Sequence, residues 1–416
     1  MRLSSADESM VPRDTARAQP GTPSGPLHGV RVLDLSRMVA GAVTGMLLAD
    51  FGADVIKVEQ PGTGDPLRQW QSNGRMLWSQ VYGRNKRFIT LNLKSADGRA
   101  LIRDLLPTCD VVVESFVPGT LERLGLGWDV LRAWNPRVIL LRISGWGQDG
   151  PGAARPAFGT LVEAASGFAA MNGEPGRPPI VPSFPLADMT AGLSAVSALM
   201  FALYHRDVHG GGGQCIDVSL FESLFAVLGP LPAEYAASGT TRERQGSRSR
   251  NAGPRGCYPT SDGRWIAVSG STPKMAERFL RGYGLDALLD DPRFANNEAR
   301  VQHAAALDAV VGAAIEARTC DENLAIIAAN GLTAVPVQTI ADIEQDPHWQ
   351  ARHLTVDMPS PSGNVRMHNV SPRLSDTPGA ITHVGADLGA DNEAVYCGEL
   401  GLSHDALQRL RDDGVI

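Results

Sequence analysis

The stretch from Arg177 to Asp207, RPPIVPSFPLADMTAGLSAVSALMFALYHRD, places one carboxylate, Asp188, between a proline-rich segment and a long apolar run. A carboxylate side chain can act as a nucleophile toward an activated acyl group. Aspartate is also a favoured helix N-cap, because it accepts the free N–H groups of the first turn, here those of Thr190 or Ala191. The prolines predict that no helix precedes Asp188, so capping is the ordinary explanation. The stretch alone leaves both roles open.

Other polar positions suggest weaker possibilities. Asp65, in GTGDPLRQW, follows a turn-forming segment, so it and Asp188 are candidates for the carboxyl edge of an α/β sheet, where such folds bind ligands. The segment LDLSRMVAGAVTG could hold a phosphate at a helix N-terminus. It has neither a GxGxxG nor a P-loop pattern, so helix packing through small residues is the alternative. Gly210 to Gly213 lie between an expected helix and an expected strand, which predicts a turn.

Charged and metal-binding residues give little further guidance. Five arginines fall between Arg242 and Arg255, and they could either attract an anionic substrate or solvate a linker. His205 and His209 are four residues apart, but no third ligand is evident, so we predict no metal site. Neither a Ser-His-Asp nor a Cys-His set can be identified in the sequence.

The elements that must position these residues follow a strand–helix alternation from residue 30 onward. The expected strands cover 30–36, 53–59, 88–94, 109–116 and 137–147, and the chain returns to strand within 210–222, after the four glycines. The expected helices cover 41–52, 96–106 and 119–134, together with a long helix beginning at Asp188. Spacings of three and four place Met189, Leu193, Val196, Met200 and Leu203 on one face of that helix. Short Val/Ile/Leu-rich strands between longer helices predict an α/β fold with a parallel sheet covered on both faces.

The pattern changes near residue 230 and predicts a division of the chain. We expect a disordered N-terminal tail at 1–26, a large α/β domain at 27–228 and a linker with a mobile loop at 229–255. A smaller α+β domain follows at 256–340, opening with a hairpin around Asp262-Gly263. Residues 341–416 are expected to return to the large domain and to end in a helix.

Composition narrows the functional classes. The chain has 416 residues, 43% hydrophobic and 20% charged, with a net charge of −7. An acidic protein of this kind is an unusual nucleic-acid binder, so we predict no such partner. The five cysteines form no CxxC pair, which favours reduced thiols in the cytoplasm. No apolar run approaches the roughly 20 residues that span a bilayer, and residues 1–26 lack the apolar region of a secretory signal, so no membrane association is predicted.

Several segments, in this order and at these spacings, together resemble the class III CoA-transferases, also described as the formyl-CoA transferase or carnitine-CoA-transferase-like family. These segments are GVRVLDLSRMVAG, LLADFGADVIKVEQPGTGDPLR, NKRFITLNLKSADGR, DVVVESFVPGTLERLGLG, NPRVILLRISGWGQDGP, LADMTAGLSAVSALMFALYHRD, GGGGQCIDVSLFES and GLTAVPVQTIADIEQDP. The resemblance extends from about Leu27 to Ile416.

The resemblance implies a Rossmann-like large domain, a small domain, and a ring-shaped chain that interlocks with a second copy in a homodimer. It implies transfer of CoA from an acyl-CoA to a free carboxylic acid, with a small dicarboxylate expected, and no permanently bound cofactor. Asp188 matches the family's catalytic aspartate, which passes through acyl anhydride and aspartyl-CoA thioester intermediates. The implied CoA contacts are Val39, Ala40, Gln60, Leu91, Lys94, Ser115, Phe116 and Arg123.

Some positions depart from the family pattern. Gln60 stands where some relatives have an arginine for the adenine, and the glycine-rich lid is reduced to Gly253–Gly256, GPRG. Acyl-CoA racemases of the same family use a histidine at the position of Phe158 together with the aspartate. Because proton transfer needs that second base, the sequence favours a transferase over a racemase. A CoA-binding protein without activity is the third alternative.

Overall fold

The computed structural model describes residues 25–416, and the tail predicted for 1–26 therefore falls almost entirely outside the described residues. The described chain divides into two units. Unit 1 contains residues 25–162, Phe184–Leu224 and Thr355–Ile416, and unit 2 contains Glu163–Ser183 and Phe225–Leu354. Glu163–Ser183 thus associate with unit 2, although the predicted large domain of 27–228 included them.

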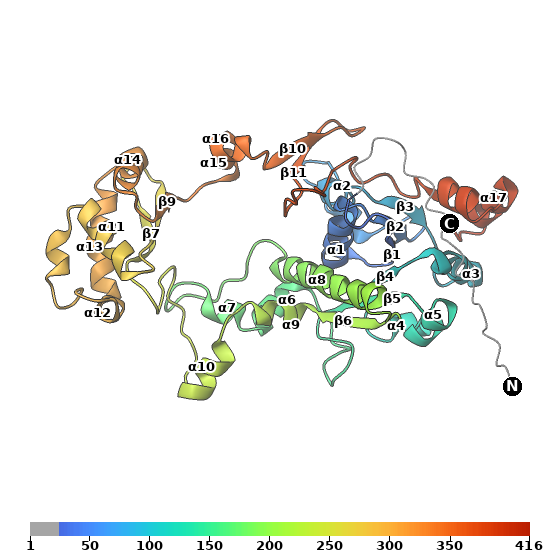
Figure 1. The fold of residues 1–416 in the computed structure, drawn as a ribbon, viewed down its shortest axis with the longest axis horizontal. Helices are drawn as coiled ribbons and strands as arrows, with labels where there is room; N and C mark the ends of the chain where they lie inside the picture. Colours follow the sequence, from blue (N-terminus) through green and yellow to red (C-terminus); the bar gives the residue numbers. More distant parts are fainter. Residues whose placement is uncertain (1–24) are drawn as a thin grey trace, which may run out of the picture. The chain divides into compact units, whose positions relative to one another are not determined.

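Unit 1 is built on a six-stranded parallel sheet (Figure 1). Its strands are β1 (Arg31–Asp34), β2 (Asp54–Glu59), β3 (Arg87–Thr90), β4 (Val111–Glu114), β5 (Ile139–Ser144) and β6 (Cys215–Ser219). The order is β3-β2-β1-β4-β5-β6 and every neighbouring pair is parallel. The predicted α/β class and parallel sheet are confirmed. The chain adds strands outward from β1 on one side and then begins again with β4 on the other side of β1.

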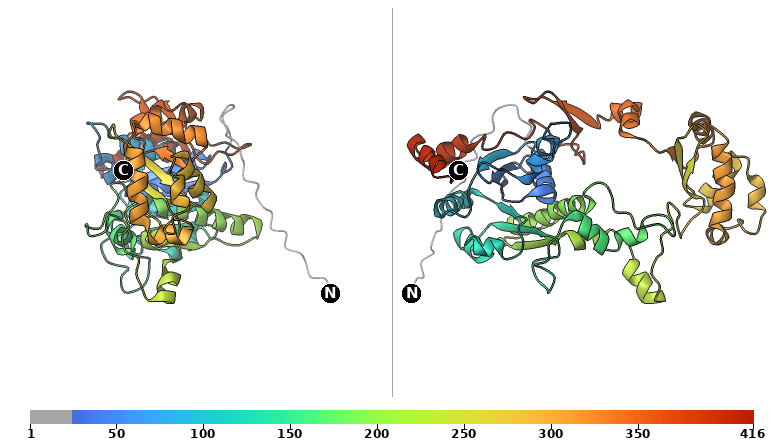
Figure 2. Two further views of the ribbon diagram at one scale, coloured as in Figure 1. Left: turned by 90° about the vertical axis from the view of Figure 1, so that its left-hand side faces the viewer. Right: turned by 180° about the vertical axis from the view of Figure 1, so that it is seen from behind.

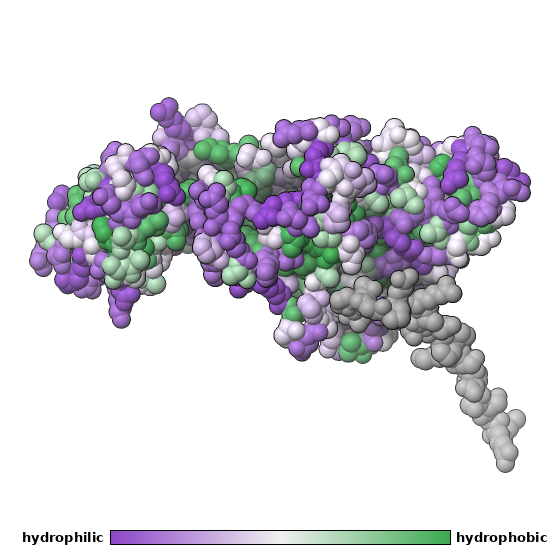
Figure 3. All heavy atoms as spheres, turned by 90° about the horizontal axis from the view of Figure 1, so that it is seen from above, coloured by the Kyte–Doolittle hydropathy of each residue, from purple (hydrophilic) through white to green (hydrophobic). Residues whose placement is uncertain are grey.

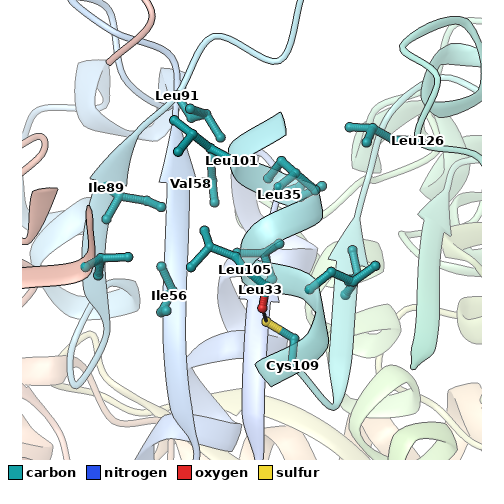
Figure 4. Close-up of a cluster of buried hydrophobic side chains, with 14 of the residues drawn as sticks. Leu33, Leu35, Ile56, Val58, Ile89, Leu91, Leu101, Leu105, Cys109 and Leu126 are labelled. Carbon is teal, nitrogen blue, oxygen red and sulfur yellow. Dashed lines mark hydrogen bonds between the residues drawn. The ribbon is translucent and has the colours of Figure 1, made fainter. Parts of the chain in front are cut away.

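One face of this sheet is covered by helices α3 (Ala96–Leu105), α5 (Trp128–Trp134) and α17 (His404–Asp412). Figure 4 shows Leu101 and Leu105 of α3 lying over Leu33 and Ile56 of the strands. All four side chains are fully or almost fully buried. The alternating residues of each strand supply this core, because successive side chains in a strand point to opposite faces.

The opposite face carries α1 (Met38–Asp50) and α8 (Leu186–Val208), which pack against each other. Contact is close because small residues meet at the crossing. A Cβ atom added to Gly192 would lie 2.9 Å from Val43 Cγ1 and 3.1 Å from the Ala40 carbonyl oxygen. The Thr44 hydroxyl lies 3.4 Å from the carbonyl oxygen of Gly192. The fixed relation of α8 to α1 therefore depends on glycine at position 192.

Helix α8 differs from its prediction in its packed face. Apart from Arg206, the buried residues of this helix are small or branched, namely Ala187, Ala191, Gly192, Ala195, Leu199, Ala202 and Leu203. Leu193, expected on the inner face, is 57% exposed. Close approach to α1 requires small side chains, so the bulkiest residues turn outward. By length and composition α8 is the one helix of residues 25–416 that could span a bilayer, but here it packs on α1, β5 and β6.

The remaining elements of unit 1 lie in its connections and its last segment. They are the 3₁₀ helices η1 (Pro66–Gln69) and η2 (Leu106–Thr108), helices α2 (Leu77–Tyr82), α4 (Thr120–Arg123), α6 (Gly159–Ala165) and α9 (Leu220–Ala226), the antiparallel hairpin β10 (Thr355–Met358) and β11 (Val365–His368), and a π-helix, η4 (Ala394–Glu399). Helices α6 and α9 continue across the boundaries between the units. The return of the chain brings Val395, Tyr396 and Val415 into the core beneath α3.

Unit 2 has its own core around a three-stranded antiparallel sheet, β7 (Arg255–Pro259), β8 (Trp265–Ser269) and β9 (Ala334–Pro336). Its helices are α7 (Phe168–Met171), α10 (Leu231–Ser238), α11 (Pro273–Gly282), η3 (Asp286–Leu289), α12 (Asn297–Gln302), α13 (Ala304–Glu316), α14 (Cys320–Asn330), α15 (Ile340–Gln345) and α16 (Pro347–Ala351). Phe279, Leu307 and Ile327 from three of these helices bury against the sheet, and Figure 2 shows α13 beside it. The hairpin predicted around Asp262-Gly263 is confirmed.

Candidate active site

A cavity of about 240 Å³ lies in unit 1 where four parallel strands end. Its lining comes from the ends of these strands and the segments that follow them: Leu35–Arg37 after β1, Val58 and Glu59 at the end of β2 with Gln60, Gly64 and Asp65 after it, Leu91–Lys94 after β3, and Phe116, Thr120 and Leu124 after β4. Strand order reverses between β1 and β4. Open α/β sheets bind ligands outside the carboxyl ends of the strands at such a reversal. This cavity is therefore the first candidate for the substrate site.

Behind Asp65 of the cavity wall lies a buried network of charges. The Lys57 ammonium lies 3.1 Å from an Asp65 oxygen and 3.7 Å from an Asp34 oxygen. It also donates to the carbonyl oxygen of Ser36 in the loop after β1. Lys86, 1% exposed, lies 3.1 Å from the other oxygen of Asp34. Burying such charges is costly unless they are paired, so these contacts fix the loop above them.

Titration of this network follows from its pairing. Burial opposes ionisation of Asp34, but the ammonium groups of Lys57 and Lys86 keep its pKa below the ordinary value. Burial would also lower the pKa of Lys57, yet the carboxylates around it raise that pKa. For Lys86, burial is the stronger influence and lowers the pKa.

Asp65 and Glu59 line the cavity but their charges are already balanced. Asp65 pairs with Lys57, accepts the N–H of Leu67 at 2.9 Å, and so caps η1. Glu59 forms two bonds with the Arg68 guanidinium, of 2.7 and 3.0 Å. Asp65 does lie at the carboxyl edge, as expected, but its contacts assign it a structural role.

The eight implied CoA contacts occupy three kinds of position. Gln60, Leu91, Lys94 and Phe116 line the cavity. Ser115 and Arg123 contact lining residues: Ser115 bonds to the backbone of Arg37, and Arg123 donates to the Thr120 hydroxyl at 2.7 Å. Val39 and Ala40, 1% and 4% exposed, lie in the first turn of α1 and can offer a ligand only backbone groups. Their roles toward CoA stay predictions.

Asp188 lies in the first turn of α8, but it does not cap the helix. Helix α8 begins at Leu186 and Pro185 occupies the N-cap position, so the prediction of Asp188 as N-cap is wrong. Proline restricts its own backbone and that of the residue before it. A helix can therefore start directly after Pro185, two residues earlier than we expected. Asp188 is half-buried.

The packing of α8 places this turn near the cavity's end of the sheet. Met189, adjacent to Asp188, packs with Val39 of α1 and Leu67 of η1. At the other end of α8, Arg206 lies 3.1 Å from Asp110, which precedes β4. Helix α8 thus runs opposite to the strands, and its first turn lies at their carboxyl ends. A helix N-terminus stabilises a carboxylate in its ionised, nucleophilic form.

Arg37 is a cavity residue that no sequence motif singled out. It lines the cavity, and its side chain has no hydrogen bond or ion pair with any residue in 25–416. Its one visible signal was its place in LDLSRMVAG, at the end of an expected strand. Only the folded topology, which brings Ser115 of the loop after β4 against it, identifies it.

The arginine-rich segment and the GPRG segment belong to unit 2. Arg242, Arg248, Arg250 and Arg255 line a second cavity, of about 340 Å³, together with Asn172. Arg242 pairs with Glu234, and Arg248 pairs with Asp308. The side chains of Arg250 and Arg255 form no hydrogen bond or ion pair within the described part of the chain. Glu243 also lines this cavity, but the two unpaired guanidinium groups outnumber it, so the cavity can accept an anion.

The Gly253–Gly256 segment is held on both sides in the structure. Arg255 and Gly256 begin β7 and pair with Ser269 and Val268 of β8. The carbonyl oxygen of Pro254 accepts the N–H of Gly270 at 2.7 Å. The linker expected at 229–255 also contains helix α10. Within residues 25–416, no group of three metal-binding side chains is found.

Comparison with known proteins decides the family. A model of CoA-transferase family III matches residues 27–392. The chain belongs to this family. It is therefore a CoA-transferase, and the resemblance seen in its segments is confirmed.

Named relatives and solved structures agree with this assignment. The succinyl-CoA–D-citramalate CoA-transferase of Chloroflexus aurantiacus is 40% identical over 398 residues, covering 95% of this chain and 99% of the relative. The succinyl-CoA–L-malate CoA-transferase beta subunit of the same organism is 38% identical over 398 residues, covering 94% and 98%. The crystal structure of a CAIB/BAIF family protein from Brucella suis has a TM-score of 0.80 and 33% identity, covering 90% of this chain and 99% of that one.

Proposed function

We propose that this CoA-transferase moves CoA from an acyl-CoA, with succinyl-CoA as the first candidate, to a short dicarboxylic acid through covalent intermediates on Asp188. The observation that carries the proposal is the placing of the first turn of α8 at the carboxyl edge of the sheet that also forms the cation-lined cavity. Two relatives named for succinyl-CoA and for citramalate or malate, both dicarboxylates, support the choice of substrates.

The chemistry proceeds by four balanced displacements. The Asp188 carboxylate attacks the thioester carbonyl carbon of the donor. The C–S bond breaks, CoA leaves as a thiolate, and a mixed anhydride between Asp188 and the donor acyl group is formed. The thiolate attacks the aspartyl carbonyl and releases the donor acid, which leaves an aspartyl-CoA thioester. The acceptor carboxylate displaces the thiolate to form a second anhydride. The thiolate then attacks the acceptor's carbonyl, which gives the new acyl-CoA and restores Asp188.

The position of Asp188 suits this series of displacements. At the third residue of a 23-residue helix, the carboxylate is stabilised as the anion that attacks. Backbone N–H groups at a helix start can also stabilise the oxyanions that form at each displacement. No proton is transferred in any step, so the pathway needs no general base.

We also propose that the second cavity, whose lining lies wholly within unit 2, binds carboxylates. Arg250 and Arg255 line one cavity and lack partners within residues 25–416. Arginine binds carboxylates through paired, charge-assisted hydrogen bonds. These two residues are therefore our candidates for the groups that bind a dicarboxylate in unit 2 more tightly than a monocarboxylate.

The finer architecture is also part of the proposal. We propose the Rossmann-like, ring-shaped chain and the interlocked homodimer, with the protein in the cytoplasm. The outward face of α8 supports a second copy, because Leu193, Phe201, Tyr204 and Val208 are each more than half exposed. Figure 3 shows hydrophobic residues scattered over a largely hydrophilic face of the molecule. Light scattering after size-exclusion chromatography should give twice the mass of the chain, and a monomer would contradict the dimer.

One experiment tests the covalent mechanism. The protein is incubated with succinyl-CoA, quenched with hydroxylamine or borohydride, and the modified residue is mapped by mass spectrometry. We expect the label at Asp188, and no exchange activity in Asp188→Ala. Asp129→Ala is the matched control, because Asp129 is an exposed acid in the first turn of α5. An unlabelled Asp188, with full exchange activity in the alanine variant, would refute the mechanism.

The same preparation separates a transferase from a racemase. In D₂O without an acceptor acid, a racemase would incorporate deuterium at the α-carbon of a branched acyl-CoA. We expect no incorporation, because Phe158, which is 67% exposed, provides no second base.

A further inference from the structure

Arg37 is an unneutralised cation in the wall of the unit 1 cavity. The two acids that share this wall already have partners, since Glu59 pairs with Arg68 and Asp65 pairs with Lys57. Lys94, exposed in the same wall, also has no side-chain partner within residues 25–416. The cavity therefore carries a net positive charge, although the whole chain is acidic.

The backbone at Arg37 is fixed from two sides. The hydroxyl of Ser115 accepts the N–H of Arg37 at 2.8 Å and donates to its carbonyl oxygen at 3.1 Å. The next residue, Met38, has a φ of 63°, a left-handed conformation that costs a non-glycine residue about 1–3 kcal/mol. Asp65 retains this conformation by accepting the Met38 N–H at 3.1 Å, and Lys57 holds Asp65 in turn.

Helix α1 adds to the positive potential at this place. It begins at Met38, extends for 13 residues and has no acidic side chain in its first turn. The N-terminus of a helix of this length attracts anions. An arginine on a fixed backbone, a lysine and a helix N-terminus thus contribute positive charge to one cavity.

We propose that Arg37 binds a phosphate group of CoA and that Ser115 positions it for this contact. The proposal rests on the proposed function, because it assigns the CoA portion of the substrate to this cavity. CoA carries a diphosphate and a 3′-phosphate, and a guanidinium recognises either group by the same charge-assisted hydrogen bonds.

The primary test is Arg37→Gln. We expect the KM for succinyl-CoA to rise about 10- to 100-fold, the range for losing a hydrogen-bonded charge, while kcat changes less than about threefold. Arg37→Lys should recover part of the loss. Arg103→Gln is the matched control, because Arg103 is an exposed arginine of α3 that does not line the cavity. If Arg37→Gln leaves the KM unchanged, the proposal is overturned.

Truncated substrates identify the phosphate. Succinyl-dephospho-CoA lacks the 3′-phosphate, and succinyl-pantetheine lacks both groups. If the penalty of Arg37→Gln disappears with the dephospho substrate, Arg37 binds the 3′-phosphate. If the penalty persists there but disappears with succinyl-pantetheine, Arg37 binds the diphosphate. A penalty that persists with succinyl-pantetheine would overturn the proposal, because no phosphate remains.

Calorimetric titration with free CoA separates this proposal from the proposed function. Wild-type protein that binds CoA more tightly than Arg37→Gln, but transfers nothing, would refute the function and support the site.

A double-mutant cycle tests the positioning role of Ser115. Ser115→Ala should raise the KM less than Arg37→Gln does, and the two effects should not add, because Ser115 acts through Arg37. Ser115→Thr keeps the hydroxyl and should restore most of the affinity. Full additivity, or no recovery with threonine, would show that Ser115 does not position Arg37.

Discussion

The packing of α8 on α1 predicts a strong effect of Gly192→Ala on catalysis. The added Cβ atom would lie 2.9 Å from Val43 Cγ1 and 3.1 Å from the carbonyl oxygen of Ala40. Carbon atoms in contact prefer separations of about 3.5–4.0 Å, so the helices must move apart by about 0.5–1 Å. Asp188 lies one helical turn before Gly192 and would move with this part of α8.

Two magnitudes follow from this displacement. Overpacking lowers the free energy of unfolding by about 1–3 kcal/mol. Replacing a helical glycine by alanine raises it by about 1 kcal/mol. The free energy of unfolding should thus fall by about 0–2 kcal/mol. Displacing a reacting group by about 1 Å can reduce the rate about 100-fold. We therefore expect kcat to fall about 10- to 100-fold in a protein that remains folded.

The assay is the initial rate of CoA transfer from succinyl-CoA to a dicarboxylate, together with urea unfolding of the same samples. Gly312→Ala is the matched control, because it makes the same change in helix α13, where the new Cβ would lie 3.4 Å from Tyr258, an ordinary contact. The control should keep its kcat. If Gly192→Ala also keeps kcat within about twofold, α1 does not position Asp188, and the reasoning from packing is wrong.

Three further predictions concern the charges and thiols. Lys57→Met leaves Asp65 without its buried partner and should reduce the free energy of unfolding by about 3–5 kcal/mol in urea titrations; a loss below about 1 kcal/mol would contradict the role of this pair. Arg255→Gln should weaken the binding of succinate about tenfold in calorimetric titrations but change that of butyrate little; equal changes would show that Arg255 does not sense the second carboxylate. Burial raises the pKa of the Cys109 thiol to about 12, and Cys320 is also fully buried. Both thiols should therefore resist thiol reagents at pH 8 until the protein unfolds. Labelling of either cysteine in the native protein would contradict this prediction.

The sheet could be predicted from the sequence because its signal is local. Segments such as RVLD and DVIKVE are short, apolar and flanked by helices, which is typical of buried parallel strands. The start of α8 was harder to predict from the sequence. Prolines before Asp188 suggested a later start, but a proline places no restriction on the residue after it. The face of α8 was also misjudged, because Leu193 is more hydrophobic than Gly192 although only glycine fits against α1.

The cavity could be predicted only in part, since its contacts depend on topology. Nothing local indicates that Ser115 bonds to Arg37, 78 positions earlier, or that Lys57 holds the loop after β1. These pairs form because β4 and β2 are the two neighbours of β1. Aligned motifs gave the identities of Gln60, Lys94 and Phe116 as implied contacts, and the fold places these residues around one cavity.

The return of the chain to unit 1 has a consequence for how the protein is made on the ribosome. The N–H of Asn92, in the cavity wall, donates at 2.7 Å to the carbonyl oxygen of Val415, and Val415 fills the core beneath α3. Roughly 190 residues separate the end of α9 from Val415, and at about 5–20 residues per second their synthesis takes about 10–40 seconds. During that interval β2 and β3 have emerged with an apolar face still uncovered. The nascent chain is then most exposed to aggregation, and holding chaperones should bind it there until residues 355–416 arrive.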